Sequence, residues 1–118
     1  MHDPVALLRR YHAALEPYDR AAVAPLLAAG AVYHSPGLAG VIAGRDAILA
    51  AFDDYFAAHP DQRSEDSAIT AAAPRAARAI WQLRATHAPT GRTVLRRGIE
   101  TIGFDTAGRI LRVVVEDG

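Results

Sequence analysis

The sequence contains no cysteine and no lysine, has no long apolar run and carries no net charge. Without cysteine there is no disulfide, no thiolate nucleophile and no zinc site with sulfur ligands. The thirteen arginines are balanced by thirteen acidic residues and are scattered along the chain, so no field of one sign draws it to nucleic acid or to an anionic membrane. No apolar stretch approaches the length of a membrane-spanning helix. We therefore expect neither a nucleic acid nor a membrane as partner.

The usual cofactor motifs are also missing. The five histidines form no close pair with a carboxylate at a metal-binding spacing, and there is no glycine-rich phosphate loop. We expect no metal and no cofactor. The opening stretch MHDPVALLRRYH has an acid and a proline where a secretory signal has basic residues and then an apolar run, which favours a cytoplasmic protein.

What is present is enough for one core. A chain of 118 residues with 51% hydrophobic residues has the size of one ordinary domain, so we expect a single domain over residues 1–118.

The second half of the chain predicts a meander of antiparallel strands. Apolar and polar side chains alternate over residues 81–86, which is typical of a strand with one dry face. Turn residues at 89–91 and 105–108 separate three strand-like segments, and residues 68–73 predict a strand before them. Residues 61–66 are polar and predict a loop.

The first half predicts helices. Asp3 and Pro4 are typical of a helix start, and the apolar spacing predicts a helix that ends near Glu16. A second helix is expected from Asp19 to a terminator at Gly30. A third helix is expected to open at Gly44-Arg45-Asp46 and to end at His59-Pro60. Its stripe for burial is made by Ile48, Leu49, Phe52, Tyr55 and Phe56.

A short strand is expected between the second and third helices, over residues 31–35. Pro36 and Gly37 break it, and residues 38–42 form either its hairpin partner or a loop. Helices followed by antiparallel strands predict an α+β domain, in which three N-terminal helices pack on a curved, mainly antiparallel sheet.

The order of these segments resembles a known family. The residues that carry the resemblance are RYHAALEPYDRAAVAPLLAAGAVYHSP, the Gly-Arg-Asp-Ala-Ile entry to the third helix, the run from Trp81 to His87, and Gly-Phe-Asp-x-x-Gly-Arg-Ile. Together they resemble the SnoaL-like branch of the nuclear transport factor 2-like superfamily, which includes ketosteroid isomerase and polyketide cyclases. The resemblance implies a cone-shaped domain with a hydrophobic pocket, and a homodimer formed through the outer sheet face, where Gln82, Arg84 and Thr86 are expected.

Laid on the isomerase pattern, two residues match groups that stabilise a developing oxyanion. Tyr11 falls on the tyrosine of the first helix, and Glu100 falls on a strand carboxylic acid that is kept protonated. Ser35 stands where the isomerases place the carboxylate that moves the proton, and a serine hydroxyl is no base near neutral pH without an activating neighbour.

Other residues are candidates for the pocket. His34 and His87 have a useful proton affinity, although His34 alternates with Ser35 along the strand and His87 lies near a turn. Candidate pocket-lining residues are Tyr33, Ser35, Phe52, Tyr55, Phe56, Trp81 and His87.

Two roles for Glu100 and two functions for the whole protein remain open. Glu100 is either a pocket hydrogen-bond donor or the partner of Arg96, which shares its strand face. The protein is either an isomerase or cyclase that works on a small apolar carbonyl compound through an enolate, with Tyr11, Glu100 and His34 as catalytic residues, or a non-catalytic binding or dimerisation module.

Overall fold

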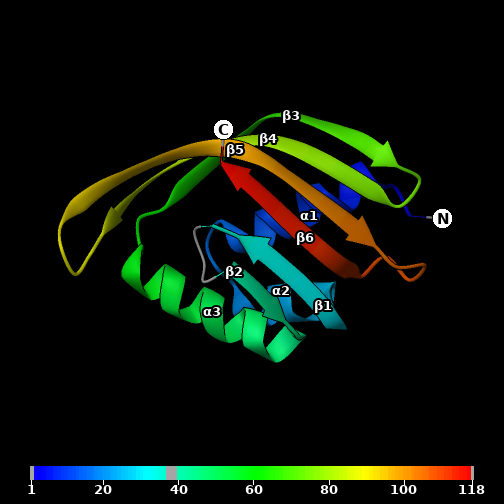
Figure 1. Cartoon of the computed structure of the whole chain (residues 1–118), viewed down its shortest axis with the longest axis horizontal. Helices are drawn as coiled ribbons and strands as arrows, with labels where there is room; N and C mark the ends of the chain where they lie inside the picture. The colour runs from blue at the N-terminus through cyan, green and yellow to red at the C-terminus, as the bar shows by residue number, and fades with distance from the viewer. Residues whose placement is uncertain (1, 37–39, 118) are drawn as a thin grey trace.

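The computed structural model describes residues 2–36 and 40–117. Helices come early in the chain and strands fill its second half (Figure 1). The helical elements are α1 (Pro4–Leu15), α2 (Arg20–Val23), the 3-10 turn η1 (Ala24–Leu26) and α3 (Arg45–Ala58). The strands are β1 (Leu27–Ser35), β2 (Gly40–Ala43), β3 (Arg63–Ala73), β4 (Ala76–His87), β5 (Arg92–Phe104) and β6 (Ile110–Asp117).

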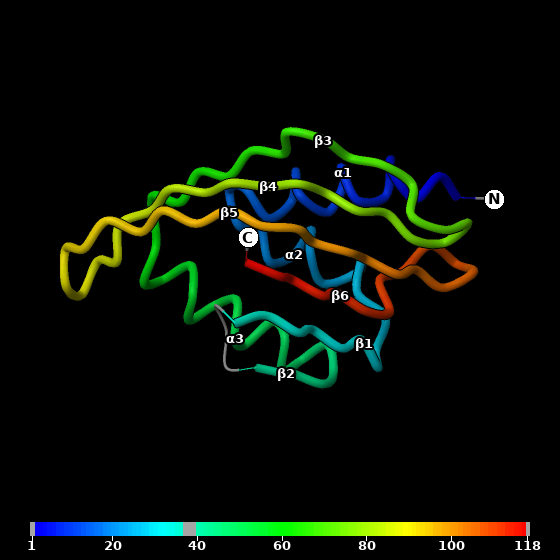
Figure 2. Tube along the Cα trace, turned by 45° about the horizontal axis from the view of Figure 1, so that its top comes forward, coloured from blue at the N-terminus to red at the C-terminus, as the bar shows by residue number. Residues whose placement is uncertain are grey.

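The six strands form one curved sheet in the order β2-β1-β6-β5-β4-β3. The pairing of β1 with β6 is parallel, and the other four pairings are antiparallel. Helix α1 packs against β3 and β4, whereas α3 packs against β1 and β2 (Figure 2). The prediction of an α+β domain with helices on a mainly antiparallel sheet is confirmed.

The helix starts follow the expected local chemistry. The Asp3 carboxylate accepts a hydrogen bond from the Val5 amide at 3.0 Å, and Pro4 occupies the first turn of α1. Leu8 and Tyr11 lie on the buried face of this helix. The Asp19 carboxylate caps α2 in the same way, by accepting from the Ala22 amide.

The expected second helix is wrong beyond its first turn. The chain passes through the 3-10 turn η1 and enters β1 at Leu27, so Gly30 lies inside a strand and does not end a helix. Leu27 is fully buried and pairs with Ile110 of β6. Pro25 interrupts the helix, and strand pairing then overrides the helix propensity of the alanine-rich segment.

The expected polar loop at residues 61–66 is also wrong over most of its length. Strand β3 begins at Arg63, and Asp66 pairs with Trp81 of β4. This strand lies at the sheet edge and is mostly exposed, so it has no apolar alternation to reveal it.

The two alternatives for residues 38–42 are resolved in favour of a hairpin. Strand β2 returns antiparallel to β1, with Gly40 opposite Ser35. Residues 37–39, where the turn and the start of the returning segment were expected, lie outside the described residues.

Gly98 allows a close approach at the middle of the sheet. It lies opposite Trp81, and a Cβ at this position would come within 1.9 Å of the Glu116 carbonyl oxygen and 2.9 Å of the Trp81 ring. The absence of a side chain therefore lets the indole lie flat against β5, where it forms part of the inner sheet face.

Candidate functional site

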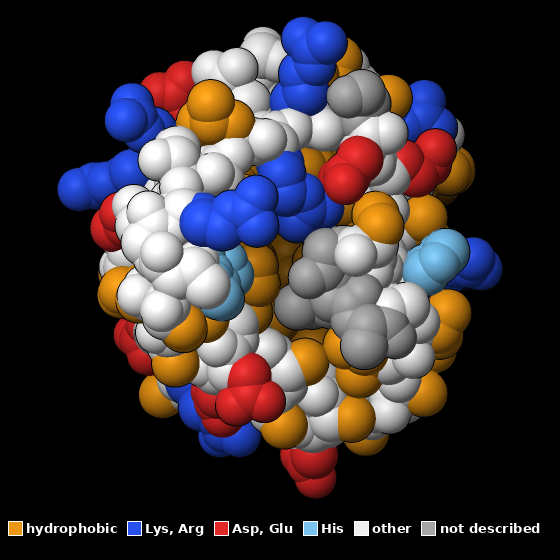
Figure 3. Space-filling view, turned by 60° about the vertical axis from the view of Figure 1, so that its left-hand side comes forward, with side chains coloured by type: hydrophobic (Ala, Val, Ile, Leu, Met, Phe, Trp, Pro, Cys, Tyr) orange, Lys and Arg blue, Asp and Glu red, His pale blue; other side chains and the backbone are white. Residues whose placement is uncertain are grey.

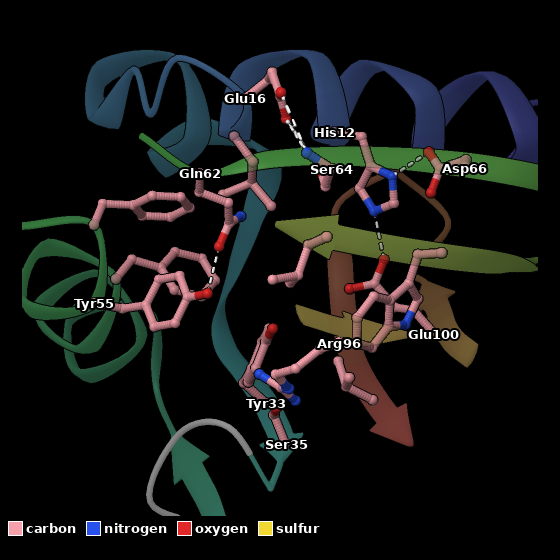
Figure 4. A pocket seen from close by; sticks show the side chains of 16 residues that line it. His12, Glu16, Tyr33, Ser35, Tyr55, Gln62, Ser64, Asp66, Arg96 and Glu100 are labelled. Atoms are coloured by element: carbon pink, nitrogen blue, oxygen red, sulfur yellow. Dashed lines mark hydrogen bonds and ion pairs between the residues drawn. The ribbon is translucent and has the colours of Figure 1, made fainter. Parts of the chain in front are cut away.

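A cavity of about 110 Å³ lies between the inner sheet face, α1 and α3. Its wall is aromatic and aliphatic on one part and strongly polar on another (Figure 4). The apolar and aromatic lining residues are Leu15, Tyr33, Phe52, Tyr55, Phe56, Trp81, Leu83 and Val115. The polar and charged lining residues are His12, Glu16, Ser35, Gln62, Ser64, Asp66, Arg96 and Glu100.

One face of the molecule is hollowed at its centre. Hydrophobic side chains are visible inside this hollow, and arginine side chains lie at its rim (Figure 3).

The polar part of the cavity is built around His12, which projects from α1 toward the sheet. Its Nδ1 donates to Asp66 Oδ2 at 2.6 Å, and its Nε2 donates to Glu100 Oε1 at 2.5 Å. We call His12, Asp66 and Glu100 the charged end. Each of the three comes from a different element, α1, β3 and β5, so the group forms only when the sheet and helix pack together.

The charged end holds His12 as an imidazolium. Burial alone lowers the pKa of His12, but its hydrogen bonds to Asp66 and Glu100 and the attraction of the two carboxylates raise that pKa to about 10. An imidazole that donates through both nitrogens carries a positive charge and has no lone pair left to accept a proton. His12 is therefore a cation at neutral pH.

The opposite end of the cavity is aromatic. The Tyr55 hydroxyl donates to the Gln62 side-chain oxygen, and Tyr55 and Gln62 lie across the cavity from the charged end (Figure 4). The Phe56 ring meets Tyr55 edge-on at 5.2 Å, and the Phe52 ring meets Tyr33 in the same way, also at 5.2 Å. We call Phe52, Tyr55 and Phe56 the aromatic end.

Two buried tyrosines lie near Glu100. Tyr33 lines the cavity, and burial together with the negative charge of Glu100 raises the pKa of its phenol. Tyr11 is fully buried behind the lining, and burial, Tyr33 and Glu100 raise its pKa as well. Both phenols are therefore neutral hydrogen-bond donors near neutral pH.

Two buried donors have no hydrogen-bond acceptor within the described parts of the chain. They are the Tyr11 hydroxyl and the indole nitrogen of Trp81. A buried donor without an acceptor costs about 1–3 kcal/mol, so each marks a place where an acceptor oxygen is favoured.

Of the two alternatives for Glu100, the pair with Arg96 is not observed among the described residues. The Arg96 guanidinium donates to Asp117 at 2.6 Å and lies 5.5 Å from the Trp81 ring centroid. Glu100 is instead hydrogen-bonded to His12, which comes from α1.

The other candidate residues divide into two groups. Tyr33, Ser35, Phe52, Tyr55, Phe56, Trp81 and Glu100 all line the cavity. His34 is exposed on β1, while His87 hydrogen-bonds the Thr90 hydroxyl at 2.7 Å and lies 5.3 Å from the His59 ring. Neither histidine lines the cavity.

His12 and Asp66 were not among the residues predicted from the sequence to form the site. The spacing of α1 puts His12 on the same face as Leu8 and Tyr11, so its inward position was visible in the sequence. Asp66 gave no such signal, because it belongs to the edge strand that was expected to be a loop.

Metal and membrane sites receive no support from the described residues. Within them, no group of three or more histidine and acidic side chains is arranged to hold a metal ion. No helix there combines the length and apolar character needed to cross a bilayer.

Residues 8–113 match the family described as the SnoaL-like domain, and the chain belongs to that family. Its fold is shared with solved structures of the nuclear transport factor 2-like superfamily. Among curated proteins, none matches this chain significantly.

Three solved structures illustrate the likeness. RV0760c from Mycobacterium tuberculosis, in complex with estradiol-17beta-hemisuccinate, has a TM-score of 0.83 and 21% identity, over 95% of this chain and 91% of that one. Delta 5-3-ketosteroid isomerase from Mycobacterium sp. has a TM-score of 0.82 and 21% identity, over 96% of this chain and 91% of that one. A provisionally named SnoaL-like polyketide cyclase from Shewanella denitrificans has a TM-score of 0.81 and 16% identity, over 96% of this chain and 88% of that one. At these identities the likeness establishes the fold alone.

Proposed function

We propose that the cavity binds a small apolar molecule with a carbonyl group and catalyses proton transfer next to that carbonyl through an enolate. An isomerase and a cyclase both fit this description. The cavity of about 110 Å³ suits a single ring or a short chain better than a large rigid ligand.

The observation that carries the proposal is a pair of buried donors without an acceptor among the described residues, Trp81 on the cavity wall and Tyr11 behind it. A carbonyl oxygen supplies the missing acceptor, and the rest of an apolar ligand fills the aromatic end. Negative charge that develops on the oxygen strengthens such hydrogen bonds in a dry site, which is how donors of this kind accelerate enolate formation.

The proposal assigns the donor role to Tyr33, which lines the cavity, and to Tyr11 behind it. It assigns proton movement to the charged end in place of His34 or His87, since the latter two lie away from the cavity. Ser35 then serves as a polar part of the wall.

A small β,γ-unsaturated ketone, cyclohex-3-enone, tests the proposal. Its conversion to the conjugated enone is followed by ultraviolet absorbance, and exchange of its α-hydrogens by NMR in deuterium oxide. We expect catalysed conversion by the wild type and roughly a 100-fold loss in Tyr33→Phe and Tyr11→Phe, because each removes a donor to the oxyanion. Full turnover in both variants would contradict the donor assignment.

A second candidate is binding without chemistry. Ser35 stands where isomerases carry a carboxylate, and the neighbouring RV0760c was solved with a bound steroid ester. Trp81 is the sole tryptophan of the chain and lines the cavity, so its fluorescence reports binding directly. Saturable quenching by cyclohexenones, with no hydrogen exchange, would favour this candidate over the enzyme.

We also propose a homodimer through the outer sheet face, where Gln82, Arg84 and Thr86 project. Ile80 and Ile99 are cross-strand partners on that face, and both are exposed. Burying such a pair against a second copy would remove apolar surface from water. Sedimentation equilibrium at micromolar concentration is the measurement; a monomer at all concentrations would contradict it.

A further inference from the structure

The carboxylate of Glu100 is the most buried acidic group on the cavity wall. Its side chain is 8% exposed, whereas the side chain of Asp66 is 20% exposed. One of its oxygens, Oε1, accepts the hydrogen bond from His12. The other oxygen points into the cavity (Figure 4), and no hydrogen bond within the described residues engages it.

The groups around the charged end differ in whether they can accept a proton. The His12 ring uses both nitrogens as donors and has no free lone pair. Tyr11 and Tyr33, which approach Glu100 from α1 and β1, are neutral donors. Arg96, which follows the same strand face, is a permanent cation and is paired with Asp117. Two carboxylates of the charged end therefore keep an oxygen that no hydrogen bond within the described residues engages, Asp66 and Glu100. Glu100 is the more buried of the two, and its second oxygen points into the cavity (Figure 4).

We propose that Glu100 is the proton acceptor of this cavity, and that His12 and Asp66 are positioning residues that keep its carboxylate ionised and oriented. The proposal rests on the proposed function and reverses the role that the isomerase resemblance implies for this position, where a protonated acid donates a hydrogen bond. The reason for the reversed role is the positively charged imidazolium of His12 next to Glu100. A cation bonded to the carboxylate favours its charged form, and a charged carboxylate is an acceptor.

The proton transfer balances without any further reactant. The free oxygen of Glu100 takes a proton from the carbon next to the carbonyl, and the electron pair of that C–H bond moves into the carbonyl group to give a dienolate. The same proton then returns from Glu100 to the γ-carbon as the conjugated double bond forms. The carboxylate is restored, and no electron is gained or lost.

Asp66 completes the arrangement from the other side of the ring. It holds Nδ1 at 2.6 Å, so the imidazolium is oriented by two carboxylates and its Nε2 proton is directed at Glu100. A carboxylate behind a histidine fixes both ring orientation and protonation state in many catalytic sites.

The test compares Glu100→Gln, Glu100→Asp, Asp66→Asn and His12→Gln with Glu65→Gln, using cyclohex-3-enone as the probe. Glu65 follows β3 on the face opposite to Asp66, is exposed and takes no part in the site, so its variant is the matched control. We expect Glu100→Gln to lower the conversion rate at least 100-fold, with quenching of Trp81 by cyclohex-2-enone unchanged within threefold. Glu65→Gln should keep the wild-type rate within twofold.

The pH profile separates positioning from a structural role. In His12→Gln the acid limb of the rate profile should move to higher pH, because the Glu100 carboxylate loses a neighbouring positive charge. Asp66→Asn should move it in the same direction by less. An acid limb that stays at the wild-type pH in both variants would contradict the positioning roles of His12 and Asp66.

The outcomes also separate this proposal from the function on which it rests. If Glu100→Gln fails to fold, Glu100→Asp answers the question, since it keeps a carboxylate but withdraws it, and the rate should fall about tenfold or more. An active wild type with Glu100→Gln equally active overturns the role of Glu100 and leaves the proposed function standing. A wild type that converts no probe overturns both.

Discussion

The two ends of the cavity are built by different means. The charged end takes one residue each from α1, β3 and β5, which meet only in the folded chain. The aromatic end takes its three residues from the single helix α3. The charged end is therefore governed by protonation and long-range packing, whereas the aromatic end is governed by volume and local helix spacing. Under the proposed function, the charged end carries out the proton transfer and the aromatic end holds the ligand.

The largest expected effect is a loss of stability at alkaline pH that depends on the charged end. The pKa of His12 is raised from 6.5 in the unfolded chain to about 10 in the folded protein. Its stabilisation is fully present below pH 6.5 and decreases as the pH rises toward 10. We expect the free energy of unfolding to fall by on the order of 2–4 kcal/mol between pH 6.5 and 9.5, measured by urea denaturation.

His12→Gln is the variant that breaks this dependence. Its free energy of unfolding should change much less over the same pH range, while Tyr55→Phe at the aromatic end should keep the wild-type slope. Equal slopes in the wild type and His12→Gln would contradict the pairing of His12 with its two carboxylates.

The next effect concerns the strand that carries Glu100. In Gly98→Ala the new methyl group collides with the backbone carbonyl of Glu116 and with the Trp81 ring, so β5 and β6 must shift. We expect a destabilisation of about 3 kcal/mol and altered Trp81 fluorescence. Gly103→Ala on the same strand meets no atom within 4 Å and is the control, with an expected change under about 1 kcal/mol. Equal stabilities for the two variants would contradict the close approach at Gly98.

A smaller effect is expected at the aromatic end. Phe56→Ala removes a cavity wall and a ring that stacks on Tyr18 at 4.5 Å. Binding of cyclohex-2-enone, followed by Trp81 fluorescence, should weaken about tenfold, because roughly 1–2 kcal/mol of apolar contact is lost. The acid limb of the rate profile should stay where it is. A shifted limb would show that the two ends are not separable.

The smallest effect on the site is expected from the outer sheet face. Leu95 is 71% exposed on β5, and Leu95→Glu should weaken the proposed dimer while leaving ligand binding and folding nearly unchanged. Sedimentation equilibrium checks the first expectation and Trp81 quenching the second. A dimer that persists in this variant would place the interface elsewhere.

Local periodicity accounts for what the sequence could predict. Phe52, Tyr55 and Phe56 recur at helical spacing, and Trp81 and Glu100 fall on the inner face of strands by their period of two. The aromatic end of the cavity wall is therefore predictable from the sequence alone. The domain architecture followed from the same patterns and from the family resemblance.

The charged end was not predictable in this way. Asp66 lies on an exposed edge strand whose polar residues resemble a loop, and its contact with His12 spans 54 positions of sequence. The early start of β1 was missed for a related reason, since an alanine-rich segment has helix propensity and only its pairing with β6 makes it a strand. Both features depend on tertiary partners that no local pattern specifies.

The protonation state of His12 tests the account most directly. In a sample labelled with ¹⁵N, the imidazole nitrogens of the histidines are followed by NMR from pH 5 to 9.5. We predict that His12, assigned by its absence in His12→Gln, keeps both nitrogens protonated beyond pH 9, with both protons in strong hydrogen bonds. A His12 ring that titrates near pH 6.5 would contradict the charged end and, with it, the role of Glu100.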